Sequence, residues 1–375
     1  MRLLNDMKRN LRNVPGFRTN RKIVVLESDD WGSERAASIH TLNNLKKAGY
    51  AVEKCSMTSV DALESNDDLE LLFEMLGGFK DRNGNPPVIS AFFNVANPDF
   101  KKIKESDFYE YHYLNIAETA KKYKDHNRIL DLYREGFHNK LFHAEYHGRE
   151  HLHVSKWLKM LQAGQEDVRI GFELDFTGFS GSYAPGIGMR AAYDLIDMAD
   201  LQFMCNAVKD GLDVFEQTFG YRSNYFVSPN GLYPRFGDFE KILKESGVKF
   251  LGGASLQKVR DKTGHRKMKH FYLGKYNYLK QRYITRNGIF EPHDTQNDWV
   301  ALCLKDIQSA FRWNKPAIIS THRASYVGTL DSKNREKGLR DLHMLLRSIL
   351  KEWPETEFMN TKELTCLVEP KSCQK

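Results

Sequence analysis

Carboxylates and imidazoles follow three short apolar runs in this sequence. Runs of this length and character are typical of buried strands. In an α/β barrel, the loops that follow the parallel strands converge on one mouth. We therefore expect the polar residues after these runs to meet in space, namely Asp29 and Asp30 after 23–26, His147 and His151 after 141–146, and His322 after 317–320.

One carboxylate and two neutral imidazoles form an open binding site for a first-row metal ion such as zinc. The four-residue spacing of His147 and His151 puts both rings within reach of one ion. His143 and His293 are the substitute ligands if one of these rings points elsewhere. The remaining carboxylate and imidazole could serve as general base and general acid. The residues leave open which of the two adjacent aspartates takes which role.

Other residues near these strand ends are candidates for contacts with a substrate. Trp31, before Gly32, suits an aromatic wall at a tight turn, and Asn230 and Gly231 form a Pro-Asn-Gly turn. Such a turn can aim a backbone N–H at a developing oxyanion. A polar segment, 291–299, contains His293, a further candidate for substrate contact, and Asp298. Asp298 either caps a helix or orients an imidazole from behind.

A second interpretation concerns the same histidine pair. Residues 147–151 read His-Gly-Arg-Glu-His, which matches the H-x-x-E-H motif of one class of metallopeptidases. Glu150 would then be the general base. That motif requires a regular helix, whereas here an apolar run leads directly into it and Gly148 weakens a helix. The peptidase interpretation therefore ranks below the barrel interpretation.

The periodicity predicts strands that alternate with helices, which indicates βαβ units and a parallel sheet. Helices are expected near 39–48, 69–76, 207–219, 236–246 and 334–353, and in the first 20 residues, where a helix would cap the bottom of the barrel. Predicted strands cover 22–28, 88–95, 141–146, 170–176, 224–228, 248–252, 317–321 and 356–359. We expect one domain over 1–375, with an extension at 1–20 and insertions near 100–139, 177–190 and 254–288 over the mouth.

Composition limits the classes of function. The net charge of +7 over 375 residues comes without interleaved aromatic motifs, so no nucleic-acid partner is expected. No apolar run reaches 18 residues, and the first residues lack the apolar core of a secretory signal. Five scattered cysteines without a C-x-x-C spacing predict no disulfide framework. These features together predict a cytoplasmic protein without a membrane span; the oligomeric state cannot be predicted.

Taken in order, these segments resemble the motifs of the polysaccharide deacetylase family (carbohydrate esterase family four, the NodB-homology domain). The resemblance spans roughly residues 22–366 and indicates a divergent member. The first three matches are residues 27–30 with the family's Thr-Phe-Asp-Asp, 91–95 with Ala-Thr-Phe-Phe-Val, and 147–151 with His-Ser/Thr-x-x-His. The next three are residues 227–231 with Arg-x-Pro-Tyr-Gly, 294–299 with Asp-x-x-Asp-Trp, and 318–322 with the final strand that ends in His.

The resemblance implies an α/β fold, a distorted (β/α)7-type barrel with long inserted loops over its C-terminal mouth. It implies metal-dependent removal of acetyl groups from an N-acetyl or O-acetyl sugar or polysaccharide, which for the N-acetyl group is hydrolysis of a linear amide C–N bond. By carry-over, Asp30, His147 and His151 bind one divalent ion, zinc or else cobalt, nickel or manganese. Asp29 is then the base, His322 the acid, and Asp298 a supporting residue. Their residue numbers follow from the matched motifs.

The chain departs from the family at two positions of the third motif. Val227 stands where the family has an arginine that steadies the catalytic aspartate, and Asn230 stands in place of the tyrosine. These departures leave a third interpretation open, a catalytically inactive barrel that binds glycans.

Overall fold

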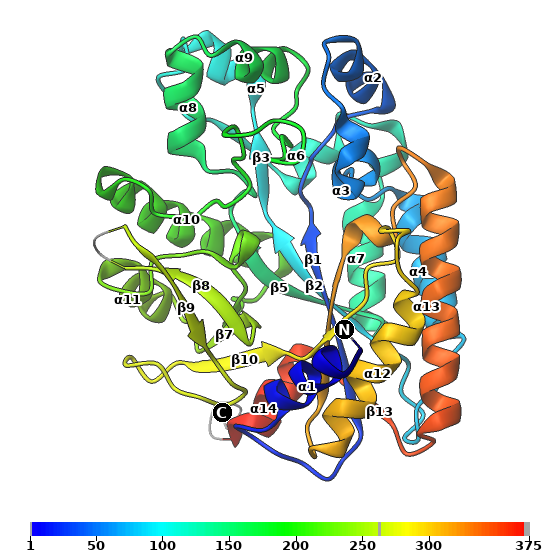
Figure 1. The fold of residues 1–375 in the computed structure, drawn as a ribbon. Coiled ribbons are helices and arrows are strands. Elements are labelled where there is room, and N and C mark those ends of the chain that lie inside the picture. The colour runs from blue at the N-terminus through cyan, green and yellow to red at the C-terminus, as the bar shows by residue number, and fades with distance from the viewer. Residues whose placement is uncertain (1, 262–263, 371–375) are drawn as a thin grey trace.

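Apolar runs form the parallel strands at the centre of the fold (Figure 1). The computed structural model describes residues 2–261 and 264–370. Seven of the eight predicted strand segments are strands here. The strands that correspond to them are β1 (Ile23–Trp31), β2 (Ile89–Asn94), β5 (Phe142–Gly148), β6 (Tyr225–Phe226), β7 (Phe250–Ala254), β12 (Ala317–His322) and β13 (Glu357–Phe358).

The sheet is a nearly closed, distorted (β/α) barrel, as expected. Neighbouring strands follow the order β10, β7, β6, β5, β2, β1, β12 and β11. Strand β10 (Arg282–Arg286) pairs with β7, and β11 (Gly288–Ile289), which follows after one residue, pairs with β12. This continuous segment joins the two edges of the sheet. The arrows of β1 and β2 in Figure 1 point towards the mouth, near α3 (Ser56–Val60) and α6 (Ile116–Ala120).

Helices surround the barrel, and their caps follow from the sequence. Ser65 and Asp68 form a capping box at the start of α4 (Asn66–Gly77), whose apolar face packs on the sheet. The other helices are α1 (Arg2–Asn13), α2 (Ile39–Lys47), α5 (Phe100–Glu105), α7 (Ile129–His138), α8 (Val154–Gln162), α9 (Glu166–Glu173), α10 (Leu201–Phe219), α11 (Asp238–Glu245), α12 (Trp299–Arg312), α13 (Ser332–Glu352) and α14 (Thr361–Val368).

Two antiparallel pairs lie outside the barrel. They are β3 (Ala96–Pro98) with β4 (Tyr113–Asn115), and β8 (Leu256–Arg260) with β9 (Arg266–His270). Three hydrophobic clusters hold the fold together: one fills the space between sheet and helices, one fills the barrel, and one packs α2, α8, α9 and residues 176–189.

Two predictions about elements were wrong, and one strand of the barrel was not predicted. Residues 170–176, where apolar residues alternate, belong to α9 and the turn after it. Strand β10 lies inside the segment 254–288 that was expected to be an insertion, because charged residues at both of its ends hide the apolar run. The helix that fills the bottom of the barrel is α14, whose Leu364 and Val368 join the barrel cluster, whereas α1 packs along α12.

The cysteines differ from expectation at one position. Cys55, Cys205 and Cys303 carry free thiols, but Cys366 is disulfide-bonded. Sequence spacing alone does not show which cysteines approach closely enough to bond. Among the described helices, none combines the length and apolar character needed to cross a membrane.

Candidate active site

The end of β1 presents two adjacent carboxylates to the same cavity. Consecutive side chains of a strand normally point to opposite faces. Here Asp30 has a φ of 75°, and the pairing with β2 shifts register between Ser28 and Trp31. This bulge turns both Asp29 and Asp30 towards the mouth, where both line the cavity. A left-handed aspartate costs backbone energy, which is typical of functional sites.

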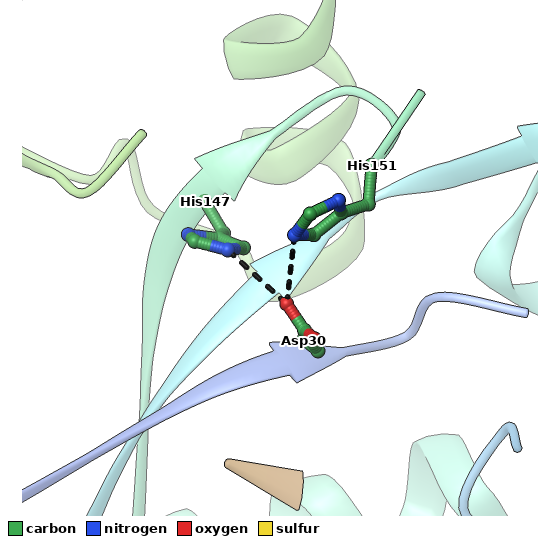
Figure 2. Close-up of side chains that lie close together, drawn as sticks. All are labelled: Asp30, His147 and His151. Carbon is green, nitrogen blue, oxygen red and sulfur yellow. Dashed lines mark ion pairs between the residues drawn. The ribbon is translucent and has the colours of Figure 1, made fainter. Parts of the chain in front are cut away.

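Asp30, His147 and His151 converge on one point (Figure 2). Oδ1 of Asp30 lies 3.3 Å from Nε2 of His147 and 3.1 Å from Nε2 of His151. All three side chains are buried, and one potential ligand atom from each lies within 4.8 Å of the others. His147 comes from the end of β5 and His151 from the loop that follows it (Figure 2). The structure therefore brings the three predicted ligands together.

The donor atoms of this triad fit a cation. Nδ1 of His147 lies 2.7 Å from the carbonyl oxygen of Val227, which can only accept, so this nitrogen carries the proton. In the neutral ring, Nε2 is then a bare acceptor that faces the carboxylate oxygen of Asp30. Oδ1 of Asp30 has no hydrogen-bond partner in the described chain. A cation between the carboxylate oxygen and the bare imidazole nitrogen would compensate both buried acceptors.

The electrostatic environment keeps His151 and Asp30 in protonation states that can bind a metal ion. Burial, with help from Arg190, lowers the pKa of His151 to about 4, so the ring is neutral near pH 7. Burial alone would raise the pKa of Asp30, but the two imidazoles hold it well below its ordinary value. A neutral imidazole and an ionised carboxylate are the forms that coordinate a metal.

Asp29 is held by an arginine from another strand. Arg286, at the end of β10, donates from Nη1 and Nη2 to the two carboxylate oxygens of Asp29, each at 2.6 Å. Its Nε donates to Glu27 at 2.6 Å. Burial raises the pKa of Asp29, but Arg286 brings it below the ordinary value. A guanidinium therefore contacts this aspartate although the third motif has Val227 in place of arginine.

His322 pairs with Asp29 across the sheet and has a carboxylate behind it. The two residues are register partners in β1 and β12, and Nε2 of His322 lies 4.0 Å from Oδ2 of Asp29. Nδ1 of His322 lies 2.6 Å from Oε1 of Glu291. Burial lowers the pKa of His322, but Glu291 and the two aspartates raise it to about 10. The imidazole is therefore protonated at neutral pH.

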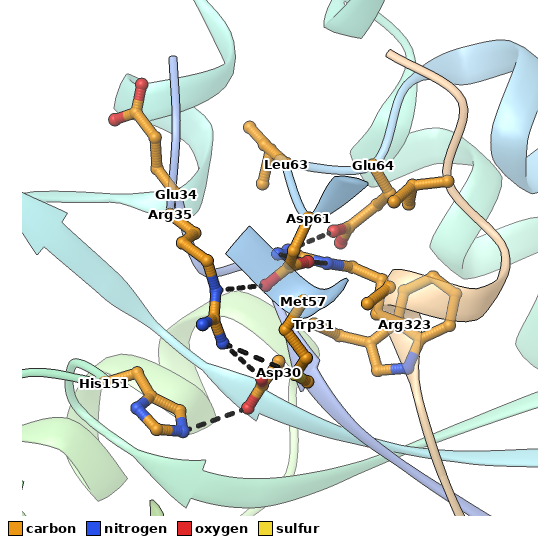
Figure 3. Close-up of polar contacts among 12 residues, drawn as sticks. Asp30, Trp31, Glu34, Arg35, Met57, Asp61, Leu63, Glu64, His151 and Arg323 are labelled. Atoms are coloured by element: carbon orange, nitrogen blue, oxygen red, sulfur yellow. Dashed lines mark hydrogen bonds and ion pairs between the residues drawn. The ribbon is translucent and has the colours of Figure 1, made fainter. Parts of the chain in front are cut away.

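A buried chain of alternating charges extends from Asp30 through Arg35 to Arg323 (Figure 3). Arg35 donates to Asp30 at 3.3 Å and to Asp61 at 2.8 Å. Arg323, which follows His322, donates to Asp61 at 2.7 Å and to Glu64 at 2.8 Å. Asp61, Glu64 and Arg323 have no exposed surface. Each charge in this chain has a partner of opposite sign, as burial requires.

The predicted substrate residues are divided between the cavity and other places. A cavity of about 830 Å³ lies over the triad, and Asn230 and Gly231 line it together with Asp29 and His322. Trp31, His293 and Asp298 are not among the described residues that line it. The N–H of Gly231 donates to the carbonyl of Ser228 at 2.8 Å, so it is already engaged.

The three remaining residues have structural contacts. Trp31 is buried in the cluster between sheet and helices and donates from Nε1 to Ser28 at 2.9 Å. His293 lies 3.0 Å from the hydroxyl of Ser325. Asp298 is exposed and accepts from the N–H of Ala301 as the N-cap of α12. The carboxylate behind His322 is therefore that of Glu291 and not that of Asp298.

The peptidase interpretation does not fit this geometry. Residues 147–151 lie at the end of β5 and in a loop, not in a helix. Arg149 donates to both carboxylate oxygens of Glu150, at 2.6 Å from Nε and at 3.1 Å from Nη2. Glu150 is not among the described residues that line the cavity. Glu150 is therefore held as an ion-pair partner and is not placed to act as a base.

Sequence reasoning missed Arg286, Glu291 and Arg190, which all line the cavity. The signal for Glu291 was present, because Glu291 opens the polar segment that contains His293 and Asp298. Arg286 was not predicted because the arginines at the ends of β10 make this strand resemble part of a basic loop. Arg190 closes the Gly- and Ser-rich stretch 177–190, where we expected an inserted loop over the mouth.

Comparisons with known proteins give only distant similarity. No protein-family profile matches the chain. No curated protein sequence matches it either. Among solved structures, a putative polysaccharide deacetylase from Mycobacterium smegmatis is 9% identical with a TM-score of 0.43, and the match covers 96% of this chain and 94% of that one. A probable polysaccharide deacetylase from Pseudomonas aeruginosa PAO1 is 8% identical with a TM-score of 0.44, over 95% and 94% of the two chains.

Other similar structures carry other names. A 4-alpha-glucanotransferase from Thermococcus litoralis is 9% identical with a TM-score of 0.42, over 92% of this chain. This chain spans 40% of the length of that enzyme. At these scores the similarity does not indicate a function.

Proposed function

We propose that the protein is a metal-dependent hydrolase that removes acetyl groups from an N-acetyl or O-acetyl carbohydrate. The observation that carries the proposal is the convergence of Asp30, His147 and His151, with Asp29 and His322 on the same cavity. One carboxylate and two imidazoles leave coordination positions open, which is typical of catalytic and not of structural zinc sites. The site thus contains ligands, a base and an acid in one place.

The ligand residues define the metal's place and role. Asp30, His147 and His151 would hold one divalent ion, with zinc as the first candidate for this donor set. When bound, such an ion lowers the pKa of water and polarises a carbonyl group. The hydrogen bond from His147 to the carbonyl of Val227 orients the imidazole for this role.

Asp29 is the proposed general base. Its carboxylate is ionised because Arg286 lowers its pKa, and it lies next to Asp30 on β1. It would take the proton of the water that attacks the acetyl carbonyl. The two hydrogen bonds from Arg286 fix the carboxylate in one orientation, so the base is already in place before the substrate binds.

His322 is the proposed general acid. A departing amine is too basic to leave without a proton, so amide cleavage needs a donor on the side of the leaving group. Glu291 keeps His322 protonated and aligns its ring through Nδ1, which leaves Nε2 free to donate. This Glu–His pair favours a catalytic barrel over a barrel that only binds glycans, because binding alone does not require a protonated imidazole against a carboxylate.

Acetate release tests the proposal. Purified protein, loaded in turn with zinc, cobalt, nickel and manganese, would be incubated with acetylated mono- and oligosaccharides, and acetate would be measured enzymatically. We expect metal-dependent release that is abolished by a chelator and restored by added metal. An Asp30→Ala variant serves as the inactive control, and Asp298→Asn, which alters only the cap of α12, serves as the active control.

Three results would contradict the proposal. Absence of acetate release from the whole panel, by protein shown to contain a metal ion, would favour the glycan-binding interpretation. If the wild type hydrolysed peptides and the Glu150→Gln variant did not, the peptidase interpretation would be favoured in spite of the geometry. A barrel that releases acetate while Asp30→Ala remains active would show that the chemistry takes place elsewhere.

A further inference from the structure

Arg190 is a buried cation beside the metal triad. It closes the stretch 177–190 and is 8% exposed, and it lines the cavity together with His151 and Asp30. The carbonyl of Met189 accepts from the N–H of His153 at 2.7 Å. This bond ties the backbone before Arg190 to the loop that carries His151, so the guanidinium has a fixed place at the cavity wall.

No acceptor within the described chain satisfies this guanidinium. Its Nε and Nη2 are buried and have no hydrogen-bond partner. Among the described residues, the nearest carboxylate oxygen is Oδ2 of Asp30, which lies 3.7 Å from Nη2, too far for a hydrogen bond. That oxygen already accepts from Arg35 at 3.3 Å. Buried guanidinium groups in proteins are normally ion-paired and hydrogen-bonded. Arg190 is an exception, because the described chain supplies no hydrogen-bond acceptor for it.

A role as the counter-charge of Asp30 alone does not explain Arg190. Arg35 already serves Asp30 and Asp61, and Arg323 serves Asp61 and Glu64. A divalent ion at the triad would add further positive charge to the same carboxylate. An uncompensated buried charge costs stability unless a ligand uses it.

We propose that Arg190 binds an anionic group of the substrate, so that the acetylated sugar also carries a carboxylate or a phosphate close to its acetyl group. A guanidinium is suited to either group, because its planar N–H donors match the oxygens of both. The proximity of Arg190 to Asp30 places the anion next to the acetyl group that the triad would hold. Other arginines of the chain already bind carboxylates in this way, for example Arg260 with Asp194 at 2.9 and 3.0 Å.

The inference rests on the proposed deacetylase function for the acetyl group, but its test is a binding measurement. Isothermal titration calorimetry of the zinc-loaded protein would compare three probes that share an acetamido sugar ring. These are N-acetylglucosamine, which is neutral, N-acetylmuramic acid, whose carboxylate is attached at the carbon next to the acetamido carbon, and N-acetylglucosamine 1-phosphate, whose phosphate is on the other neighbouring carbon. We expect at least one charged probe to bind about tenfold or more tightly than the neutral probe, as for a buried charge-assisted pair.

Variants assign the preference to Arg190. Arg190→Gln should remove the preference for the charged probe and change the affinity for the neutral probe less than about twofold, whereas Arg190→Lys should keep part of it. Arg222→Gln removes the same charge outside the cavity, at Asp213 and Glu216, and should have no effect. Urea unfolding of each variant checks the fold; Arg190→Gln should be at least as stable as the wild type, because it breaks no hydrogen bond.

The outcomes separate this inference from the proposed function. If no charged probe binds more tightly than the neutral one, including the case in which nothing binds, the inference is overturned. If the preference persists in Arg190→Gln, another cation is responsible and the inference is also overturned; should that variant not fold, Arg190→Lys decides the same question. If Arg190-dependent binding occurs but no probe releases acetate, the inference stands and the deacetylase proposal fails. A preference for carboxylate or for phosphate identifies which anion the substrate carries.

Discussion

Arg286 binds both carboxylate oxygens of Asp29 at 2.6 Å, although 257 residues separate the two in the chain. The same guanidinium donates to Glu27 at 2.6 Å, so one cation serves two buried carboxylates. The ion pairs link β10 to β1 across the interior of the barrel. Arg286 therefore joins the closure of the fold to the orientation of the proposed base.

Replacement of Arg286 should affect stability and catalysis together. Arg286→Gln leaves Asp29 and Glu27 buried without a counter-charge, and loss of one partner from a buried ion pair costs about 3–5 kcal/mol. We expect the free energy of unfolding, measured by urea denaturation, to fall by that amount near pH 7. Arg286→Lys keeps the charge but loses the two-point contact, so it should retain stability better than activity. Equal stability of wild type and Arg286→Gln would contradict the ion-pair assignment.

The two aspartates should separate metal binding from base catalysis. Asp30→Ala removes a ligand and should weaken zinc binding by at least an order of magnitude, as measured by competition with a chromophoric chelator. Asp29→Asn should bind zinc almost as the wild type does, while kcat/KM for acetate release falls about 10²–10⁴-fold, the usual contribution of a general base. If both variants lost zinc to the same extent, Asp29 would also be a ligand and the division of roles would be wrong.

How far the sequence predicts this site depends on where each residue lies. Asp29, Asp30, His147 and His322 follow apolar runs, so the rule that strand ends converge was enough to bring them together. Their convergence is in the structure, although their chemical roles remain proposals. Trp31 could not be placed in this way, because the bulge that turns Asp30 towards the mouth also directs the tryptophan into the core.

Arg286, which sequence reasoning missed, is a charged residue that interrupts the apolar pattern of its strand. Arg286 ends β10, and together with Arg282 it makes this strand look like a basic insertion. The inward-facing guanidinium of Arg286 is stable only because it forms ion pairs with Glu27 and Asp29. Neither ion pair can be predicted from the local sequence. The prediction of the fold class was still correct without β10, because the other predicted strands already required a parallel α/β sheet.

A helical glycine next to the site should not tolerate a methyl group. A Cβ on Gly338 of α13 would lie 1.6 Å from the carbonyl oxygen of Ser325, three residues after His322. Gly338→Ala should lower the free energy of unfolding by about 1–3 kcal/mol, as overpacking does, although alanine favours a helix. Gly77→Ala in α4 is the matched control, because nothing lies within 4 Å of its Cβ. That control should be neutral or stabilising in the same urea titration; a neutral Gly338→Ala would refute the contact.

The stability of the metal-free protein should depend on pH through His322. Glu291 and the aspartates raise its pKa to about 10 in the folded protein, against about 6.5 in an unfolded chain. A raised pKa means that this contribution to stability is fully present below about pH 6.5 and is lost as the pH rises through about 10. The difference in unfolding free energy between wild type and His322→Gln should therefore shrink steadily between these limits. A difference that is constant with pH would show that His322 does not gain a proton on folding.

The pH dependence of acetate release should also depend on the protonation of His322. If His322 is the acid, acetate release from amides falls as the pH rises through the pKa of its imidazole. Glu291→Gln removes the carboxylate that raises this pKa, so the alkaline limb of kcat/KM should move to lower pH, while zinc affinity stays within a few-fold of wild type. His322→Ala should lose about 10²–10⁴-fold on amides but far less on activated esters, whose leaving groups depart without a proton. Equal losses on both substrates, with zinc retained, would mean that His322 positions Asp29 across the 4.0 Å gap between them and does not protonate the leaving group.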